Sequence, residues 1–420
     1  MDEEKIRLPI RSALIPAFYQ NFHCLAQNCR DSCCVNWDIT FDKKDYLRLR
    51  RLDAPPTLRE RLKLGVRREK KGNHDDALYG KFDLQTNHGR CPFLDPDGLC
   101  AIQRICGHDA LPHVCTTYPR HIVYSPAAKE YALSPSCEGV LWQLWNLTDG
   151  VDFVEDPLPK EERRVVNITL GKNLLLYFAP LRSLFIDILQ NRVIPLTERM
   201  LYLGITVQWL QRADWDNFDL DSWVEQVSAL TRPDMIKETT ANIPGNRDMY
   251  LTQNLNVLGE ITLEQSWSAA IFNALEVRRN LNVMIQKNDE AEKKNQLAVN
   301  FSRKAYVDAL RQFQTAFSGH EYFFENLMVA SALYLGFPRL DSKEALWKSY
   351  VSLCNLYSFY RFVSVLGCKG EATRERLFHM IAMASRATLH NQSRFDGFQE
   401  KLFQNDSSTL AHMAILLRWD

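Results

Sequence analysis

The sequence predicts a mainly α-helical protein in two parts: a cysteine-rich N-terminal domain stapled by metal, and a larger, all-α C-terminal domain. Nine of the eleven cysteines lie between residues 24 and 137, so the thiols are concentrated in the first third of the chain. Beyond them, apolar residues recur at spacings of three and four, the period of an amphipathic helix. Strand signals such as Asn-Gly turns are missing from that C-terminal part, which favours helices packed on one another.

The composition is that of a well-packed globular chain. It has 420 residues, 46% hydrophobic residues, and 51 basic against 51 acidic side chains. This balance excludes disordered and low-complexity classes and argues against nucleic acid as the main partner. No stretch approaches the roughly 18 apolar residues of a membrane-spanning helix, and the acidic N-terminus is not a signal peptide. We therefore expect a cytoplasmic protein, away from membranes, whose thiols stay reduced.

The cysteine distribution and one charged segment set the expected domain boundaries. Residues 1–148 form the cysteine-rich domain. Residues 149–164 are charged, contain two prolines and lack an apolar period, which is typical of a linker. Residues 165–420 form the helical domain.

Apolar stripes with helical spacing run through this C-terminal domain. Three of them are Leu263, Trp267, Ile271 and Leu275; Tyr306, Leu310, Phe313 and Phe317; and Leu346, Tyr350, Leu353 and Tyr357. The first follows a capping box of Thr262 and Gln265, the second leads to a stop at Gly319, and the third follows Asp341. Each stripe predicts a helix with one buried face.

The N-terminal cysteines have the chemistry of a metal centre. Thiolates are soft ligands, and four converging sulfurs satisfy either a tetrahedral zinc ion or a four-iron cluster. Zinc modules usually contain Cys-x2-Cys pairs, which this chain lacks, so the spacing favours iron–sulfur over zinc, with zinc as the alternative metal. Nine cysteines in 114 residues are too dense for a set of ordinary buried thiols. Metal binding would then be part of folding.

The adjacent Cys33 and Cys34 also exclude one known arrangement. The radical-enzyme loop Cys-x3-Cys-x2-Cys is absent, because Cys34 follows directly after Cys29-x3-Cys33. Neighbouring side chains diverge in a helix or a strand, so we expect these two thiols to point apart. One of them is then a ligand and the other a nucleophile or packing residue, unless a cluster accepts both.

Other signals are weaker or absent. There is no glycine-rich dinucleotide turn, phosphate loop, His-Glu-x-x-His or Gly-x-Ser-x-Gly motif. The basic run from Arg48 to Lys71 is interpreted as a solvated helix and loop, with a docking face for an acidic partner, or for DNA, as the alternatives.

Four motifs carry a resemblance to a known family. They are Phe22–Trp37 with its Cys-Cys pair, Cys91–Ile102, Leu111–Arg120 with its Thr-Tyr-Pro-Arg turn, and Leu133–Glu138. Together they resemble the bacterial flagellin lysine N-methylases, part of a broader cysteine-rich set described as zinc- or iron-chelating. The resemblance covers about residues 10–140 by motif. It implies S-adenosylmethionine-dependent methylation of surface lysines on flagellin, with a [4Fe-4S] cluster in the cysteine domain.

The resemblance also implies a ligand set. The family's cysteine positions match Cys24, Cys29, Cys33, Cys34, Cys91, Cys100, Cys115 and Cys137. Cys106 falls outside the pattern and is the expected spare. Eight candidates exceed the four ligands of one cluster, so either a second metal is present or about half of them are structural.

Methylation of an amine places further demands on the site. A lysine attacks a methyl group only when it is deprotonated, which requires a base or a desolvating pocket. Glu138 and Tyr118 are the candidate catalytic residues; a surface carboxylate and a packed aromatic are the alternative interpretations. The helical domain is the candidate docking surface for flagellin, or else a scaffold. The alternative function is a non-catalytic metal-binding protein with a helical partner-binding domain.

Overall fold

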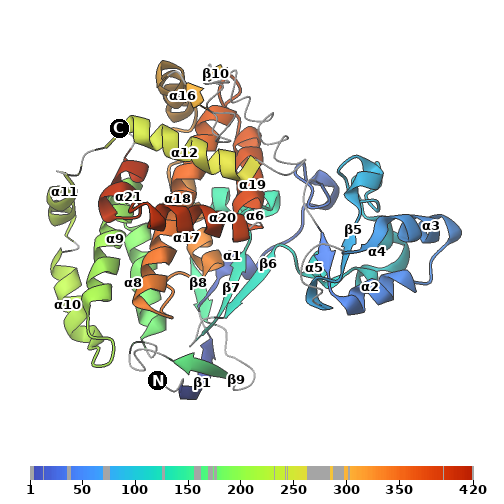
Figure 1. Cartoon of the computed structure of the whole chain (residues 1–420), viewed down its shortest axis with the longest axis horizontal. Coiled ribbons are helices and arrows are strands. Elements are labelled where there is room, and N and C mark those ends of the chain that lie inside the picture. The colour runs from blue at the N-terminus through green and yellow to red at the C-terminus, as the bar shows by residue number, and fades with distance from the viewer. Residues whose placement is uncertain are drawn as a thin grey trace.

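The computed structural model contains a large helical body and a smaller lobe at its side (Figure 1). It describes residues 4–418 except 13, 36–38, 70–75, 125–127, 156–161, 169–173, 175–176, 231, 242, 244, 263–283, 287–297, 301–302 and 391. The prediction of a mainly helical protein is confirmed. None of the helices in these ranges is long and apolar enough to cross a bilayer.

The smaller lobe combines short helices with a three-stranded antiparallel sheet. Its helices are α2 (Lys43–Arg50), α3 (Pro56–Gly65), α4 (Ala101–Cys106) and α5 (His113–Thr117). Its sheet has the order β3 (Thr40–Phe41), β5 (Gly80–Phe82), β4 (Val66–Arg68). Local chemistry starts the helices: the Asp42 side chain accepts from the Asp45 amide, and Pro56 occupies the first turn of α3, where no backbone donor is needed. The lobe has its own small apolar core.

Two further sheets contain strands that lie far apart in the sequence. A four-stranded sheet has the order β6 (Arg120–Tyr124), β7 (Ala128–Leu133), β1 (Glu4–Ser12), β9 (Glu162–Ile168). A second pair joins β2 (Leu14–Pro16) to β8 (Phe153–Glu155). The segment predicted as a linker, 149–164, thus contains β8 and the start of β9. A strand needs only backbone partners, so a charged segment without an apolar period can still pair.

Helices make up most of the body. The inner ones are α8 (Phe178–Gln190), α9 (Leu196–Arg212), α17 (Tyr322–Leu335), α18 (Lys343–Gly367), α19 (Arg374–Leu389) and α21 (Leu410–Leu417). Around them lie α1 (Ala17–Gln20), α6 (Glu138–Asn146), α10 (Leu220–Leu230), α11 (Pro233–Ala241), α12 (Arg247–Thr262), α16 (Arg303–Ala316) and α20 (Gln392–Gln404). A short hairpin, β10 (Met284–Gln286) with β11 (Ala298–Asn300), corrects the prediction that this part is all-α.

The central helix α18 holds the other helices of the body together. It is buried on nearly all sides and packs against α9, α16, α17, α19 and α21, as expected of a helix that is apolar all round. Its N-cap is Ser342, whose hydroxyl accepts from the Ala345 amide. The predicted stripe from Leu346 to Tyr357 lies in this helix and is confirmed. The stripe from Tyr306 is also confirmed. It lies along helix α16, which ends before Gly319.

The stripe from Leu263 to Leu275 lies outside the described residues.

The two apolar cores divide the chain differently from the predicted boundary. The small core draws on residues 39–111, whereas the core of the body includes Phe18, Phe22 and the helix α6. Segments on both sides of the small lobe therefore belong to the body, and the lobe is an insertion between them.

Close packing of α9 on α18 gives a prediction about Gly204. A methyl group at this position would overlap the buried Tyr350 side chain and approach Leu410. Gly204→Ala is expected to destabilise the fold by about 1–3 kcal/mol, because overpacking forces buried neighbours to move. Gly397→Ala in α20 is the matched control, since among the described residues no atom beyond its chain neighbours and its own helix backbone lies within 4 Å of the added group. The midpoint of thermal unfolding checks this; equal midpoints for the two variants would contradict it.

Candidate metal centre and adjoining cavities

Three thiols from two segments meet at the inner edge of the small lobe. Cys33 and Cys34 occupy a turn, and the Cys91 amide donates to the Cys34 carbonyl at 2.6 Å. The Cys33 and Cys91 thiols both donate to the Cys34 sulfur, and these hydrogen bonds lower the pKa of Cys34 to about 3. The prediction that Cys33 and Cys34 point apart is wrong, because the segment is a turn and not a helix or strand. A thiolate is the form that binds metal.

Two further thiols adjoin this group. Cys100 is the N-cap of α4, and Cys115 lies in α5. Burial raises the pKa of Cys115, and the charges of Cys34 and Cys100 raise it further. Burial also raises the pKa of Cys100, while backbone amides of Gln103 and Ile102 oppose that effect. The first group, which we call the inner thiols, is therefore Cys33, Cys34, Cys91, Cys100 and Cys115.

A second group lies at the start of α6, on the body. Cys137 is the N-cap of this helix, and burial raises its pKa to about 11 although amides of Val140 and Gly139 hydrogen-bond its sulfur. Cys29 donates to the Glu138 carboxylate at 3.5 Å, and Cys24 is close enough to raise the pKa values of both thiols. Cys33 is perturbed by Cys115 and by Cys137, so it lies between the two groups.

The cysteine predicted to be the spare is placed apart. The Cys106 thiol donates to the Asp53 carbonyl at 3.8 Å, and beyond burial only the Asp53 charge raises its pKa. Across the described ranges, no three Cys, His, Asp or Glu side chains are arranged to hold a single metal ion. The ligands of a four-iron cluster lie farther apart than those of one ion, because they surround several atoms. Sulfur donors drawn from distant segments, most of them half-buried, fit such a group by their chemistry.

Glu138, a predicted catalytic residue, is not on the surface. Its side chain is buried and accepts hydrogen bonds from the backbone amides of Arg30 and Asp31, at 2.6 and 2.9 Å. It also sits in the first turn of α6, where a negative charge is favoured. The alternative interpretation as a surface carboxylate is therefore wrong. This geometry gives Glu138 a positioning role, because it fixes the loop between Cys29 and Cys33.

Tyr118, the other predicted catalytic residue, is half-buried and packs against the core of the body. Its hydroxyl lies 2.9 Å from the Ser136 hydroxyl, and its ring meets the His390 ring edge-on at 6.0 Å. Burial raises the pKa of Tyr118 well above its usual range. Since the phenol keeps its proton at neutral pH, it can donate a hydrogen bond but cannot begin as a base.

Helix α19 of the body clamps the cysteine loop, which the sequence interpretation missed. His379 Nδ1 lies 2.8 Å from Asp31 Oδ1, and Arg386 Nη2 donates to the Asp31 carbonyl at 2.7 Å and the Ser136 carbonyl at 3.3 Å. His379 and Arg386 are seven residues apart and so share one helix face. That spacing was the only sequence signal, and it carries no indication of the partner.

The polar network continues at His390, which gives a prediction about pH. His390 Nε2 lies 2.8 Å from Ser136 Oγ, and burial, together with the Arg386 charge, lowers the pKa of His390 to about 3. In the unfolded chain His390 binds a proton near pH 6.5, whereas in the folded chain it stays neutral at that pH. The free energy of unfolding therefore falls as the pH drops below that value. From pH 7 to pH 5 we expect a loss of about 2 kcal/mol.

Urea unfolding at pH 5, 6 and 7 measures this loss, with His390→Asn as the comparison because asparagine keeps a polar group but does not titrate. The variant should show a shallower pH dependence. Identical slopes for the two proteins would rule out His390 as the source.

The basic run from Arg48 onward is largely engaged within its own lobe. Arg48 bonds Asp45 and the carbonyls of Asp109 and Leu111, and Arg61 pairs with Asp95 at 2.8 Å. These contacts favour the structural interpretation over a docking face for an acidic partner or DNA.

Two cavities lie in the body. One, of about 510 Å³, lies between β6, α18, α20 and the C-terminal ends of α17 and α19. The other, of about 530 Å³, is lined by aromatic residues including Trp145, Phe313 and Phe317, beside the buried Glu325 and its partner Arg199. Both volumes are in the range of ligand sites.

The fold and the site together define a helical protein. Its body binds the loop that carries Cys33 and Cys34, and thiols from distant segments of the chain lie beside that loop. The model of the FliB lysine N-methylase C-terminal domain matches residues 182–416, more than half of the chain. The chain therefore belongs to the FliB lysine N-methylase family. This match lies in the helical body, whereas the resemblance found in the sequence rested on the cysteines.

Individual relatives agree with this assignment. Lysine-N-methylases of Salmonella typhimurium and Salmonella choleraesuis are 31% and 30% identical over 191 residues, which is 44% of this chain and 44% of each relative. A flagellar biosynthetic protein FliU of Salmonella muenchen is 36% identical over 144 residues, 33% of this chain and 80% of that protein. The match thus spans less than half the length of the two methylases. No solved structure matches the chain.

Proposed function

We propose that this protein transfers methyl groups from S-adenosylmethionine to lysine side chains of flagellin and holds a [4Fe-4S] cluster at the inner thiols. Family membership supports lysine methylation as the reaction. The observation that carries the cluster is the gathering of thiols from four separate segments beside a body that clamps their loop. The flagellar name of one relative supports flagellin as the substrate.

The inner thiols are the proposed ligand set. Cys34 raises the pKa values of both Cys91 and Cys115, and the Cys115 charge also raises that of Cys91. Cys33 or Cys100 completes a set of four. When bound, an iron with an open position supplies Lewis-acid chemistry that can hold the amino and carboxyl groups of S-adenosylmethionine. Zinc at the same thiols is the alternative metal.

The chain's own residues prepare this site. Glu138 and Asp31 fix the loop that carries Cys33 and Cys34. The Arg386 guanidinium lowers the pKa of Cys34 and so favours the thiolate. Partial burial of the surroundings of Tyr118 disfavours a charged group there and so lowers the pKa of an incoming lysine, which must lose its proton before it attacks.

Flagellin docking on the helical body is part of the proposal. Because α6 packs on α17 and α19, removal of residues 165–420 would expose the core of the remainder, so a truncated chain is a poor test. Substitutions on the surface of the full-length protein are the sound way to examine docking.

The test is methyl transfer by the intact protein after anaerobic reconstitution with iron and sulfide. Flagellin, labelled S-adenosylmethionine and the protein are incubated, and modified lysines are located by peptide mass spectrometry. We expect methylated lysines with the wild type and with Cys106→Ala, and a large loss with Cys34→Ala. A folded, metal-loaded wild type that transfers no methyl group would favour the alternative of a non-catalytic metal-binding protein.

A further inference from the structure

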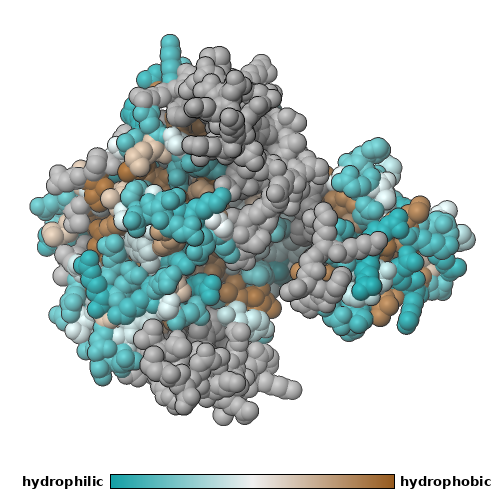
Figure 2. Space-filling model, in the orientation of Figure 1, coloured by the Kyte–Doolittle hydropathy of each residue, from teal (hydrophilic) through white to brown (hydrophobic). Residues whose placement is uncertain are grey.

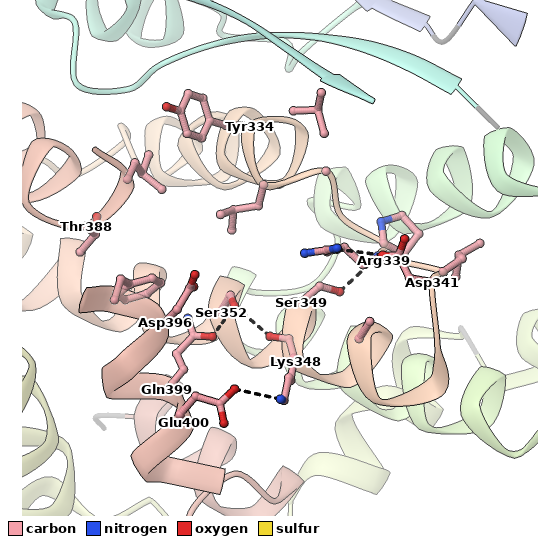
Figure 3. Close-up of a pocket in the computed structure, with 18 of the residues that line it drawn as sticks. Tyr334, Arg339, Asp341, Lys348, Ser349, Ser352, Thr388, Asp396, Gln399 and Glu400 are labelled. Carbon is pink, nitrogen blue, oxygen red and sulfur yellow. Dashed lines mark hydrogen bonds and ion pairs between the residues drawn. The ribbon is translucent and has the colours of Figure 1, made fainter. Parts of the chain in front are cut away.

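The proposed reaction needs a group that takes up a proton from the lysine ammonium, and several groups of the body are unsuited to this. The Tyr118 phenol keeps its own proton, and the Glu138 carboxylate is buried and already accepts from two backbone amides. Burial lowers the pKa of His390 to about 3, which leaves it a weak base at neutral pH. In the cavity of about 510 Å³, the acidic side chains face Arg339 and Lys348 (Figure 3).

His379, on helix α19, is arranged differently. Its Nδ1 lies 2.8 and 2.9 Å from the two carboxylate oxygens of Asp31. A carboxylate only accepts hydrogen bonds, so Nδ1 carries the hydrogen of the neutral ring and Nε2 keeps a lone pair. None of the residues that the structure describes forms a hydrogen bond with Nε2. An imidazole that a carboxylate holds in this tautomer is the base of Ser-His-Asp triads.

The imidazole of His379 is also accessible from outside the protein. Its side chain is 34% exposed, whereas that of Asp31 is 9% exposed. Because Asp31 covers the Nδ1 edge of the ring, this exposure belongs to the rest of the side chain. Helices α6 and α19 lie on the side of the body that faces the small lobe (Figure 1), and Figure 2 shows a notch between the two parts. The long, flexible stem of a lysine suits an approach from outside.

The orienting carboxylate is fixed beside the candidate metal centre. Asp31 lies between Cys29 and Cys33 in the sequence, and its amide donates to the Glu138 carboxylate at 2.9 Å. Its carbonyl accepts from Arg386 at 2.7 Å, and Arg386 Nη1 lies 3.9 Å from Asp31 Oδ1. A positive charge therefore faces the carboxylate that orients the ring.

These contacts give the pair the two properties that a general base requires. The ring is held in one orientation by a residue that is itself held by its backbone and its side chain, and fixed geometry is needed for proton transfer. An imidazole also changes its charge near neutral pH, so it can both take up and release a proton there. The charged groups joined to the pair are Glu138 of α6 and Arg386 of α19.

We propose that His379 is the general base that takes the proton from the substrate lysine, with Asp31 as the residue that orients it. Nε2 accepts a proton from the ammonium group, and the lone pair left on the amine forms the new nitrogen–carbon bond. The carbon–sulfur bond of the sulfonium breaks, and its electrons stay on the sulfur of S-adenosylhomocysteine. The imidazolium then releases its proton to water. This inference rests on the proposed lysine methylation and assigns one of its catalytic residues.

The test compares His379→Gln with the wild type as full-length, metal-loaded proteins. The glutamine amide can still donate to Asp31, so the cysteine loop stays in place, but it takes up no proton. We expect unchanged iron content, unfolding midpoint and KM for flagellin, while kcat at pH 7 falls about 100-fold or more. His108→Gln is the matched control, because His108 also faces an aspartate, Asp109, but lies on the small lobe and is 60% exposed. Its kcat should equal that of the wild type.

Two further measurements distinguish a base from a residue that only holds the loop. Imidazole added to His379→Ala should restore part of the lost rate, because a free base can enter the space left by the ring. Raising the pH from 7 to 8 should raise kcat of His379→Gln up to about tenfold, since a lysine that loses its proton near pH 10.4 without help is deprotonated more often. The wild type should change far less. A purely structural role predicts neither effect.

The outcomes separate this inference from the function on which it rests. If the wild type methylates flagellin and His379→Gln does so at the same rate, the base is wrong and methylation stands. A slow variant that has lost its iron, or that neither imidazole nor higher pH restores, gives His379 a structural role and also overturns the base. If the folded, metal-loaded wild type transfers no methyl group, the proposed function fails, and the base fails with it.

Discussion

Cys34→Ala is expected to remove most of the iron from the anaerobically purified protein, a loss of at least about tenfold. Cys34 is the thiol to which Cys33 and Cys91 donate, and its charge also raises the pKa values of Cys100 and Cys115. Its removal therefore affects every inner thiol at once. Iron and acid-labile sulfide per chain are the quantities to measure.

Cys106→Ala is the matched control, because Cys106 lies in the same lobe and packs on its small core, but none of the other cysteines perturbs its pKa. It should retain its iron. Circular dichroism of both variants establishes that the helical body has folded, and Cys34→Ser repeats the test with a side chain of similar size. Equal iron in Cys34→Ala and the wild type would show that the inner thiols do not hold the metal.

The second large effect concerns a buried ion pair in the body. Glu130 of β7 and Arg182 of α8 pair with each other, and both are at most 1% exposed. Glu130→Leu alone leaves a buried guanidinium without its partner and is expected to cost about 3–5 kcal/mol. Burial raises the pKa of Glu130 to about 7, so urea unfolding is measured at pH 8, where the carboxylate is charged.

The double variant Glu130→Leu, Arg182→Met provides the control. Replacing both charges by apolar groups should recover most of the loss, because the cost comes from the unpaired charge and not from the missing attraction. A double variant as unstable as the sum of the two single ones would mean that the two charges do not interact and would contradict this account, whereas one as unstable as Glu130→Leu alone would mean that the pair itself stabilises the fold.

Much of the helical body could be predicted from local pattern. Helix α18 carries an apolar stripe and a Ser342 cap, and α16 ends before Gly319. The family resemblance was also available from the cysteine motifs. These features are local: spacing, capping and residue type act within a few turns of chain.

What the sequence did not reveal depends on contacts between distant segments. The pairing of β1 with β9 joins Glu4 to Ile168, and the clamp joins Asp31 to His379, so neither leaves a local period. The turn at Cys33 and Cys34 is fixed by pairing with Cys91. The packing of α6 on α17 and α19 likewise places the cysteines at the junction of the lobes, not in a separate domain.

The most direct test of this account is metal analysis of the wild-type protein purified without oxygen. If thiols from four segments hold a [4Fe-4S] cluster, the preparation is brown and contains about four irons and four sulfides per chain. A colourless protein that is fully folded, contains neither iron nor sulfide, and does not take them up on reconstitution would contradict it.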